Sequence, residues 1–124
     1  MEKKEWVDGL RWLSVDQVVD LHFKLQEEIK KHYKLRNTGD HLERAIQLCE
    51  QQIALSELSL PALKAKHNAQ AKEYEALTGK NMPFDFYAPA HHGYRQLIII
   101  MKKRKDFDRV AELEAQRDAE GWRG

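Results

Sequence analysis

Apolar side chains recur at helical spacing along most of this chain, and that periodicity restricts its fold more than any other feature. Val18, Leu21, Leu25, Ile29 and Tyr33 follow one another every three or four residues, which places them on one face of a helix. Segments in which β-branched residues occupy alternate positions, the pattern of a strand, do not occur in the sequence. The sequence therefore predicts an all-α protein.

N-terminal capping signals divide the chain into about five helices. A Ser or Asp followed by Gln or Glu three residues later satisfies the free N–H groups of a first helical turn, and proline is tolerated in that turn. These signals place the helix starts at Ser14, Asp40, Ser59 with Pro61, Pro89 and Asp106. Short turns between the helices predict antiparallel helical hairpins, and the length of 124 residues predicts a single helical domain, 1–124.

Charge and cysteine content exclude several classes of protein. The 21 Lys and Arg residues nearly cancel the 20 Asp and Glu residues, so the molecule as a whole is not an electrostatic nucleic-acid binder. A single cysteine, Cys49, excludes an intramolecular disulfide and a secreted disulfide scaffold. The longest aliphatic run, 97–101, is far shorter than the ~20 residues of a membrane span, and the charged first residues do not suit a signal peptide. We expect a cytoplasmic protein with no membrane partner.

Catalytic and metal-binding motifs do not occur in the sequence. The six histidines include no pair at the i, i+4 spacing of metal-binding helices, and no glycine-rich phosphate loop or serine nucleophile motif is present. Cys49 falls on an apolar stripe with Ala45 and Ile53, where a cysteine acts as a small core residue. We therefore expect no enzyme activity, no metal and no cofactor.

Residues 92–116 resemble one tetratricopeptide repeat. Tyr94, Leu97, Ile98 and Met101 fall at the packing positions of the family's first helix, and Phe107 and Val110 fall at those of its second helix. Residues 42–51 align with 107–116 as a weaker second copy of the second helix. The resemblance implies a right-handed stack of helical hairpins that binds peptides or protein surfaces and performs no chemistry.

The resemblance also identifies a candidate binding face. First-helix side chains that do not pack line a concave groove in such repeats, and here they would be His92, Arg95, Ile99 and Lys102. Cations around an apolar centre suit an acidic peptide or a free carboxylate. A second interpretation stays open, because the cations of 102–105 also complement the negative end of a helix dipole and a single exposed isoleucine needs no explanation.

The leading hypothesis is a non-catalytic module, of adaptor or regulatory type, that binds a protein or an acidic peptide through a partly basic groove. One alternative is a nucleic-acid-associated protein that uses the basic clusters Lys30, Lys31, Lys34, Arg36 and 102–105.

A third hypothesis is a self-associating structural protein or homodimer. It rests on Ile99, Trp6 and Trp12, because interfaces favour tryptophan, and on the alanine stripe Ala62, Ala65, Ala69 and Ala76. The stripe equally suits a solvent face built from strong helix formers. The aromatic loop 80–88 either packs onto the domain or binds a partner.

Overall fold

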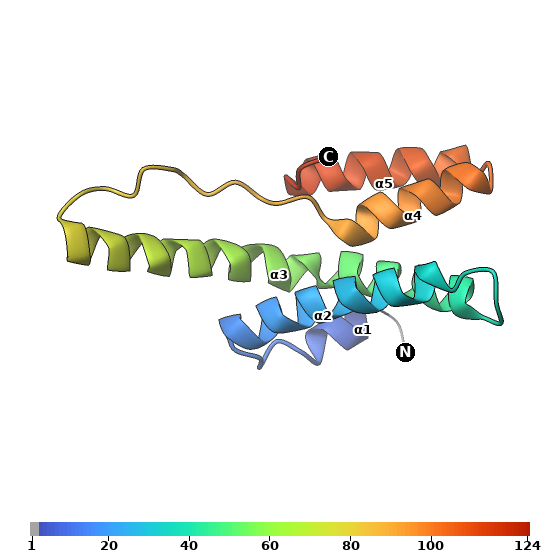
Figure 1. Ribbon diagram of the computed structural model, residues 1–124, viewed down its shortest axis with the longest axis horizontal. Coiled ribbons are helices and arrows are strands. Elements are labelled where there is room, and N and C mark those ends of the chain that lie inside the picture. Colours follow the sequence, from blue (N-terminus) through green and yellow to red (C-terminus); the bar gives the residue numbers. More distant parts are fainter. Residues whose placement is uncertain (1–2) are drawn as a thin grey trace.

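Five α-helices form the computed structural model, which describes residues 3–124 (Figure 1). They are α1 (Lys3–Asp8), α2 (Val15–Lys34), α3 (His41–Thr78), α4 (His92–Lys103) and α5 (Phe107–Glu120). Within the described residues the only extended pairing is an isolated bridge between Ala90 and Arg123. The prediction of an all-α protein is confirmed. None of the described helices is long and apolar enough to cross a membrane.

Helices α2 and α3 form an antiparallel hairpin that holds most of the core. Ser14 caps α2 as predicted, because its Oγ accepts from the Gln17 N–H while the Gln17 side chain accepts from the Ser14 N–H. Leu25 and Ile29 of α2 are buried against Leu48 of α3 in one apolar cluster. The helical pattern thus identifies both the start of α2 and the face that it buries.

Helix α3 corrects the prediction of two separate helices. It runs uninterrupted for 38 residues through Pro61, where a new helix was expected to begin. Ser59 and Ala62, on either side of that proline, are buried, so tertiary packing maintains the helix although Pro61 cannot donate a backbone hydrogen bond. The second predicted capping box is also absent, since the Asp40 side chain makes no capping hydrogen bond.

The predicted number of helices, about five, agrees with the structure only because two errors offset each other. Two predicted helices are one helix, α3, and α1 was not predicted. This short helix packs against α3, with Val7 buried and Trp6 half-buried against the main core. Trp12, in the connection to α2, is 76% exposed. The two tryptophans therefore differ in role, since Trp6 belongs to the core and Trp12 faces solvent.

Helices α4 and α5 form a second hairpin above α3 in Figure 1. Helix α4 begins at His92 rather than near Pro89, because His91 is its N-cap and accepts from the Tyr94 N–H. Asp106 caps α5 as predicted by accepting from the Arg109 N–H.

The packing positions of this second hairpin are largely those expected from the resemblance. The buried residues are Tyr94, Leu97, Ile98, Met101 and Val110. Phe107 is an exception, because its side chain is 62% exposed at the first position of α5. Ile100 is buried as well, since α4 packs against both α3 and α2.

Beyond Ala62, α3 extends away from α2, and the following segment runs back along it (Figure 1). We call residues 64–90 the projecting arm. The Phe86 ring packs on the His67 ring at a centroid distance of 5.7 Å, whereas Phe84 and Tyr87 are exposed. The aromatic loop therefore both packs and presents side chains to solvent. Of the alanine stripe only Ala62 is buried, so the rest of it is a solvent face in this chain.

Candidate functional site

Three of the four predicted groove residues lie on the outer side of α4, opposite its buried face. Arg95 and Lys102 are exposed, and Ile99 between them is 40% exposed. His92 is only half-buried and lies toward α2. The structure thus places three of the four residues on one open surface and the fourth at the junction with α2.

The surroundings of His92 show which part of α2 borders this surface. Burial lowers the pKa of His92, and the positive charges of Lys30 and Arg95 lower it further, while Glu27 acts in the opposite direction. Lys30 and Glu27 belong to α2, so the start of α4 faces the fourth and fifth turns of that helix. His92 is therefore a neutral ring between cations and not an additional cation of the groove.

Tyr33 connects α2 to the other end of α4. Its hydroxyl oxygen accepts from Lys103 Nζ at 3.1 Å, and the guanidinium carbon of Arg36 lies 4.4 Å from its ring centroid. The Lys103 ammonium is also near the ring, at 5.8 Å from the centroid. Contacts of this kind between a cation and an aromatic face are attractive.

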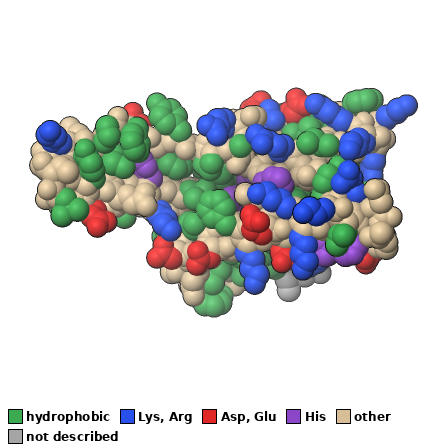
Figure 2. Space-filling view, viewed as in Figure 1, with side chains coloured by type: hydrophobic (Ala, Val, Ile, Leu, Met, Phe, Trp, Pro, Cys, Tyr) green, Lys and Arg blue, Asp and Glu red, His purple; other side chains and the backbone are tan. Residues whose placement is uncertain are grey.

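Two basic clusters that are far apart in the sequence therefore form one surface. We call this surface the basic face, and it consists of Lys30, Lys31, Lys34, Arg36, Arg95, Lys102, Lys103 and Arg104. Figure 2 shows Lys and Arg side chains gathered over the half of the molecule where α2 and α4 lie side by side. No periodicity in the sequence indicates that these clusters meet, because the meeting depends on α4 packing against α2.

Most cations of the basic face lack an acidic partner. Among the described residues, Lys30 pairs with Glu27 at 3.6 Å and Arg104 pairs with Glu43 at 2.7 Å, whereas Arg95 and Lys102 make no ion pair. Nearby charges of one sign raise the local concentration of oppositely charged ligands. The basic face is thus able to attract an anion without first breaking many internal pairs.

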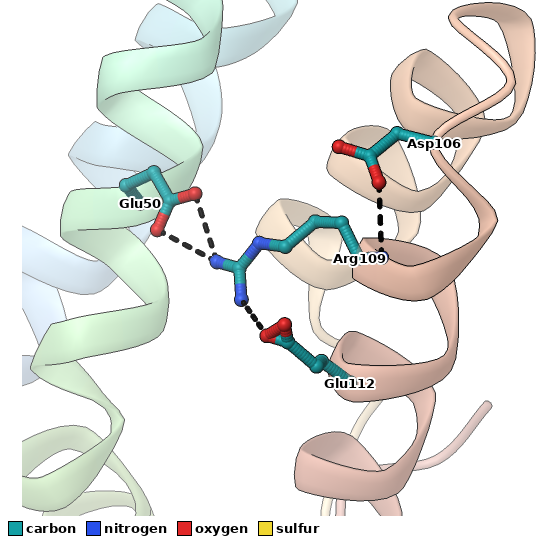
Figure 3. A network of polar contacts seen from close by, with 4 residues as sticks. All are labelled: Glu50, Asp106, Arg109 and Glu112. Carbon is teal, nitrogen blue, oxygen red and sulfur yellow. Dashed lines mark hydrogen bonds and ion pairs between the residues drawn. The ribbon is translucent and has the colours of Figure 1, made fainter.

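Arg109 of α5 shows the contrasting, structural use of an arginine in this fold (Figure 3). Its Nη2 donates to both carboxylate oxygens of Glu50 in α3, at 2.9 and 3.1 Å, and its Nη1 lies 3.5 Å from Glu112. The guanidinium is therefore committed to joining α5 with α3. Arg44 is its counterpart in the aligned segment 42–51, and within the described residues its side chain bonds only Gln47. The two copies therefore differ in structure here.

A hollow of about 290 Å³ lies at the end of the basic face. We call it the Tyr33 hollow, and it is lined by Tyr33, Arg36, Asn37, Leu42, Ile100, Lys103 and Arg104. Its lining combines three cations with an apolar floor and contains no carboxylate. Such a combination is typical of a site for a ligand that has an apolar body and an anionic end.

A buried polar cluster positions the start of α4. Gln52 accepts from the Gly93 N–H at 2.8 Å and donates to the His22 carbonyl at 3.0 Å. A Cβ at position 93 would lie 2.8 Å from Gln52 Oε1 and 3.2 Å from the Cys49 carbonyl oxygen. Glycine is therefore required here so that α4 can approach α3.

Ser56 and His91 form a serine–histidine pair inside this cluster, with Oγ and Nε2 3.1 Å apart. His91 Nδ1 accepts from the Tyr94 N–H, so the proton of the neutral ring is on Nε2, which also lies 3.2 Å from the Gln52 carbonyl. A protonated Nε2 cannot remove the serine proton, and both residues are buried. The pair therefore lacks the geometry of an activated nucleophile.

Cys49 is a free, fully buried thiol. Burial raises its pKa to about 12, and the nearby Glu50 carboxylate acts in the same direction. The thiol form is neither a nucleophile nor a metal ligand. No group of three or more His, Cys, Asp or Glu side chains suited to a metal occurs among residues 3–124.

Comparisons of the chain with protein families, with curated proteins and with solved structures find no match. The tetratricopeptide resemblance therefore stays a prediction, carried by the residues in 92–116.

Proposed function

We propose that this chain is a non-catalytic binding module whose basic face holds an acidic segment of a partner protein. The observation that carries the proposal is the state of Arg95 and Lys102. Both are exposed on α4 without an acidic partner in the described structure, on either side of the half-exposed Ile99. Arginines with a structural role, such as Arg109, are paired instead.

The chemistry of the face suits a carboxylate-rich segment. Charge-assisted hydrogen bonds from Arg and Lys to carboxylates are stronger than neutral ones, and Ile99 supplies apolar contact area between them. Opposite charges also speed the encounter of two partners. As part of this proposal the module works in the cytoplasm, where its single thiol would stay reduced.

Nucleic-acid association is the second candidate, and one observation favours it. Its two proposed basic clusters lie together in the fold, joined by the contact of Lys103 with Tyr33. Phosphate contacts release counterions, so such binding weakens steeply as salt concentration rises. The near-neutral balance of the whole chain, with 21 basic and 20 acidic residues, favours the protein partner.

Self-association draws on a different surface. Trp12 of the α1–α2 connection and Leu77, Phe84 and Tyr87 of the projecting arm are exposed, whereas Trp6 packs in the core. Light scattering over a dilution series tests this alternative, and a constant monomer mass would count against it.

The proposed function predicts that charge reversal on α4 weakens binding and leaves the fold intact. The probe is a fluorescent peptide rich in Asp and Glu with one central isoleucine, followed by anisotropy. We expect Arg95→Glu with Lys102→Glu to raise the dissociation constant of the peptide tenfold or more, since each charged hydrogen bond contributes roughly 1.5–3 kcal/mol.

The matched control is Lys64→Glu with Lys72→Glu, which makes the same charge change at exposed positions of the projecting arm. Circular dichroism confirms that both variants keep their helix content. Equal weakening by the two variants would show that only net charge matters. Tighter binding of a single-stranded oligonucleotide than of the peptide would support the nucleic-acid alternative instead.

A further inference from the structure

The Tyr33 hollow differs from the open part of the basic face because it encloses an apolar floor. Leu42 and the buried Ile100 form that floor, while Arg36, Lys103 and Arg104 stand at its rim. An acidic side chain on the open face meets cations alone, whereas a group inside the hollow also contacts hydrocarbon. The preferred ligand therefore has both an anionic end and a compact apolar body.

The donors at the rim suit an anion with several acceptor oxygens. Tyr33 Oη accepts from Lys103 Nζ, so its own O–H proton is available to donate. Arg36 uses one N–H on the Tyr33 carbonyl, and a guanidinium has five N–H groups. Arg104 is partly satisfied by Glu43 at 2.7 Å. Arg36, Lys103 and the Tyr33 hydroxyl can thus converge on one tetrahedral anion.

Size and charge identify the class of that ligand. The hollow of about 290 Å³ lies at the lower end of the range for small-molecule sites, roughly 300–1,000 Å³, which suits a compact ligand such as a phosphorylated aromatic ring. A phosphomonoester carries about −1.5 to −2 charge at pH 7, which matches the rim better than a single carboxylate does. Arg36 already covers a face of the Tyr33 ring, which disfavours stacking of a nucleic-acid base there.

We propose that the Tyr33 hollow binds an aryl phosphate, with the ring against Leu42 and Ile100 and the phosphate at Arg36 and Lys103. As a description of the ligand at the end of the basic face, this inference rests on the proposed function. Two sources share the chemistry, a phosphotyrosine within the acidic partner segment and a free small aryl phosphate.

The first test titrates phenyl phosphate and inorganic phosphate into the full chain, with binding measured by calorimetry. We expect phenyl phosphate to bind at least tenfold more tightly, because only it fills the apolar floor. Arg36→Gln with Lys103→Gln should weaken phenyl phosphate tenfold or more. The matched control is Lys64→Gln with Lys72→Gln, which removes the same charge from exposed positions of the projecting arm, away from the hollow, and should change affinity less than threefold.

Two results of that test would overturn the proposal. One is equal affinity for phenyl phosphate and inorganic phosphate, which would mean that the floor contributes nothing. The other is equal weakening by the hollow variant and the control, which would mean that no particular cation is used. All four substituted side chains are exposed, and circular dichroism verifies that each variant is folded.

The second test separates the two sources and the two proposals. It compares an acidic phosphotyrosine peptide with its unphosphorylated form, on the unmodified chain and on the Arg95→Glu, Lys102→Glu variant. One result is that the phosphopeptide binds more tightly than phenyl phosphate and that this additional affinity is lost in the Arg95→Glu, Lys102→Glu variant. The ligand is then a partner's phosphotyrosine. If the variant changes nothing while Arg36→Gln with Lys103→Gln abolishes binding, the hollow stands and the proposed acidic groove fails.

A single-stranded oligonucleotide completes the comparison. Tighter binding of the oligonucleotide than of the phosphopeptide, lost on Arg36→Gln with Lys103→Gln, would overturn the aryl phosphate proposal and make the rim part of a nucleic-acid surface.

Discussion

At the scale of single residues, two histidines lie together in the interior without any carboxylate between them. The His22 and His91 ring centroids are 5.4 Å apart, and each ring also contacts the buried Trp122. Burial lowers the pKa of His22 to about 4 and that of His91 to about 3, with mutual repulsion between the two rings adding to the effect at His91. The native fold therefore holds both rings neutral.

This arrangement predicts a loss of stability in mild acid. The unfolded chain takes up protons near pH 6.5, whereas the folded chain stays neutral at these sites until about pH 4 or below. The contribution of these two histidines to the free energy of unfolding is thus fully present above pH 6.5. It falls as the pH drops, by about 1.4 kcal/mol per pH unit for each histidine. Urea denaturation at pH 7.5, 6.5 and 5.5 measures this slope in a range where carboxylates titrate little.

The control for that slope is His91→Asn, since asparagine retains a side-chain acceptor for the Tyr94 N–H. The variant is expected to be less stable at pH 7.5 but to lose less stability between pH 6.5 and 5.5, with the remaining loss due to His22 and His92. An unchanged slope would mean that His91 is not the residue that takes up the proton on unfolding.

Single-residue roles were predictable from sequence only where periodicity determines them. Cys49 was expected in the core because it falls on an apolar stripe, and it is fully buried. Gly93 has no such signal, because its requirement comes from the approach of Gln52 and the Cys49 carbonyl across two helices. His91 as an N-cap was also not foreseen, since the proline at 89 indicated an earlier start.

At the scale of elements, local signals identify helix starts well when nothing else competes with them. Ser14 and Asp106 both cap as expected, because the hydrogen bonds involved are local. Pro61 gave an equally clear signal for a helix start, but the prediction of a new helix there was wrong. Buried neighbours on both sides of it hold one continuous helix, and no local pattern reveals that packing.

The free-energy cost of a proline inside a helix predicts that Pro61→Ala stabilises the protein. Alanine restores a backbone N–H that can bond the Glu57 carbonyl, and proline in a helix interior is about 3 kcal/mol less favourable than alanine. Because Pro61 also lines an apolar hollow with Leu10 and Val15, we expect a net gain of roughly 1–3 kcal/mol. Urea denaturation followed by circular dichroism measures it, with Lys64→Ala as the neutral control. A lower midpoint for Pro61→Ala would show that the proline shapes the contact with the α1–α2 connection.

At the scale of the whole molecule, the contacts that create the candidate site join parts far apart in the chain. Tyr33 meets Lys103 across 70 residues of sequence, and Trp122 returns to the His22 and His91 rings. The sequence suggested both basic clusters together as a nucleic-acid feature, without showing that they meet in space, and placed the peptide groove on α4 alone. Neither hypothesis contained the Tyr33 hollow, because it exists only where α2, α3 and α4 come together.

The same packing divides α3 into two parts of different stability. Ala62 is the last buried residue of this helix, and its final 15 residues, 64–78, belong to the projecting arm. Local opening free energies are low where few apolar contacts cover a helix. We expect amide hydrogen exchange to be at least about a hundredfold faster in residues 66–78 than in 45–59, which corresponds to roughly 2.7 kcal/mol.

A variant and a dilution series make this measurement decisive. Phe86→Ala removes the ring that packs on His67, so it should speed exchange further in residues 66–78 while leaving 45–59 unchanged, as detected by mass spectrometry. Uniform protection along α3 would contradict the expectation for an isolated arm. If that protection then disappeared on dilution, the exposed Leu77, Phe84 and Tyr87 would be covered by a second copy of the chain, and self-association would replace the single-chain description of this part of the molecule.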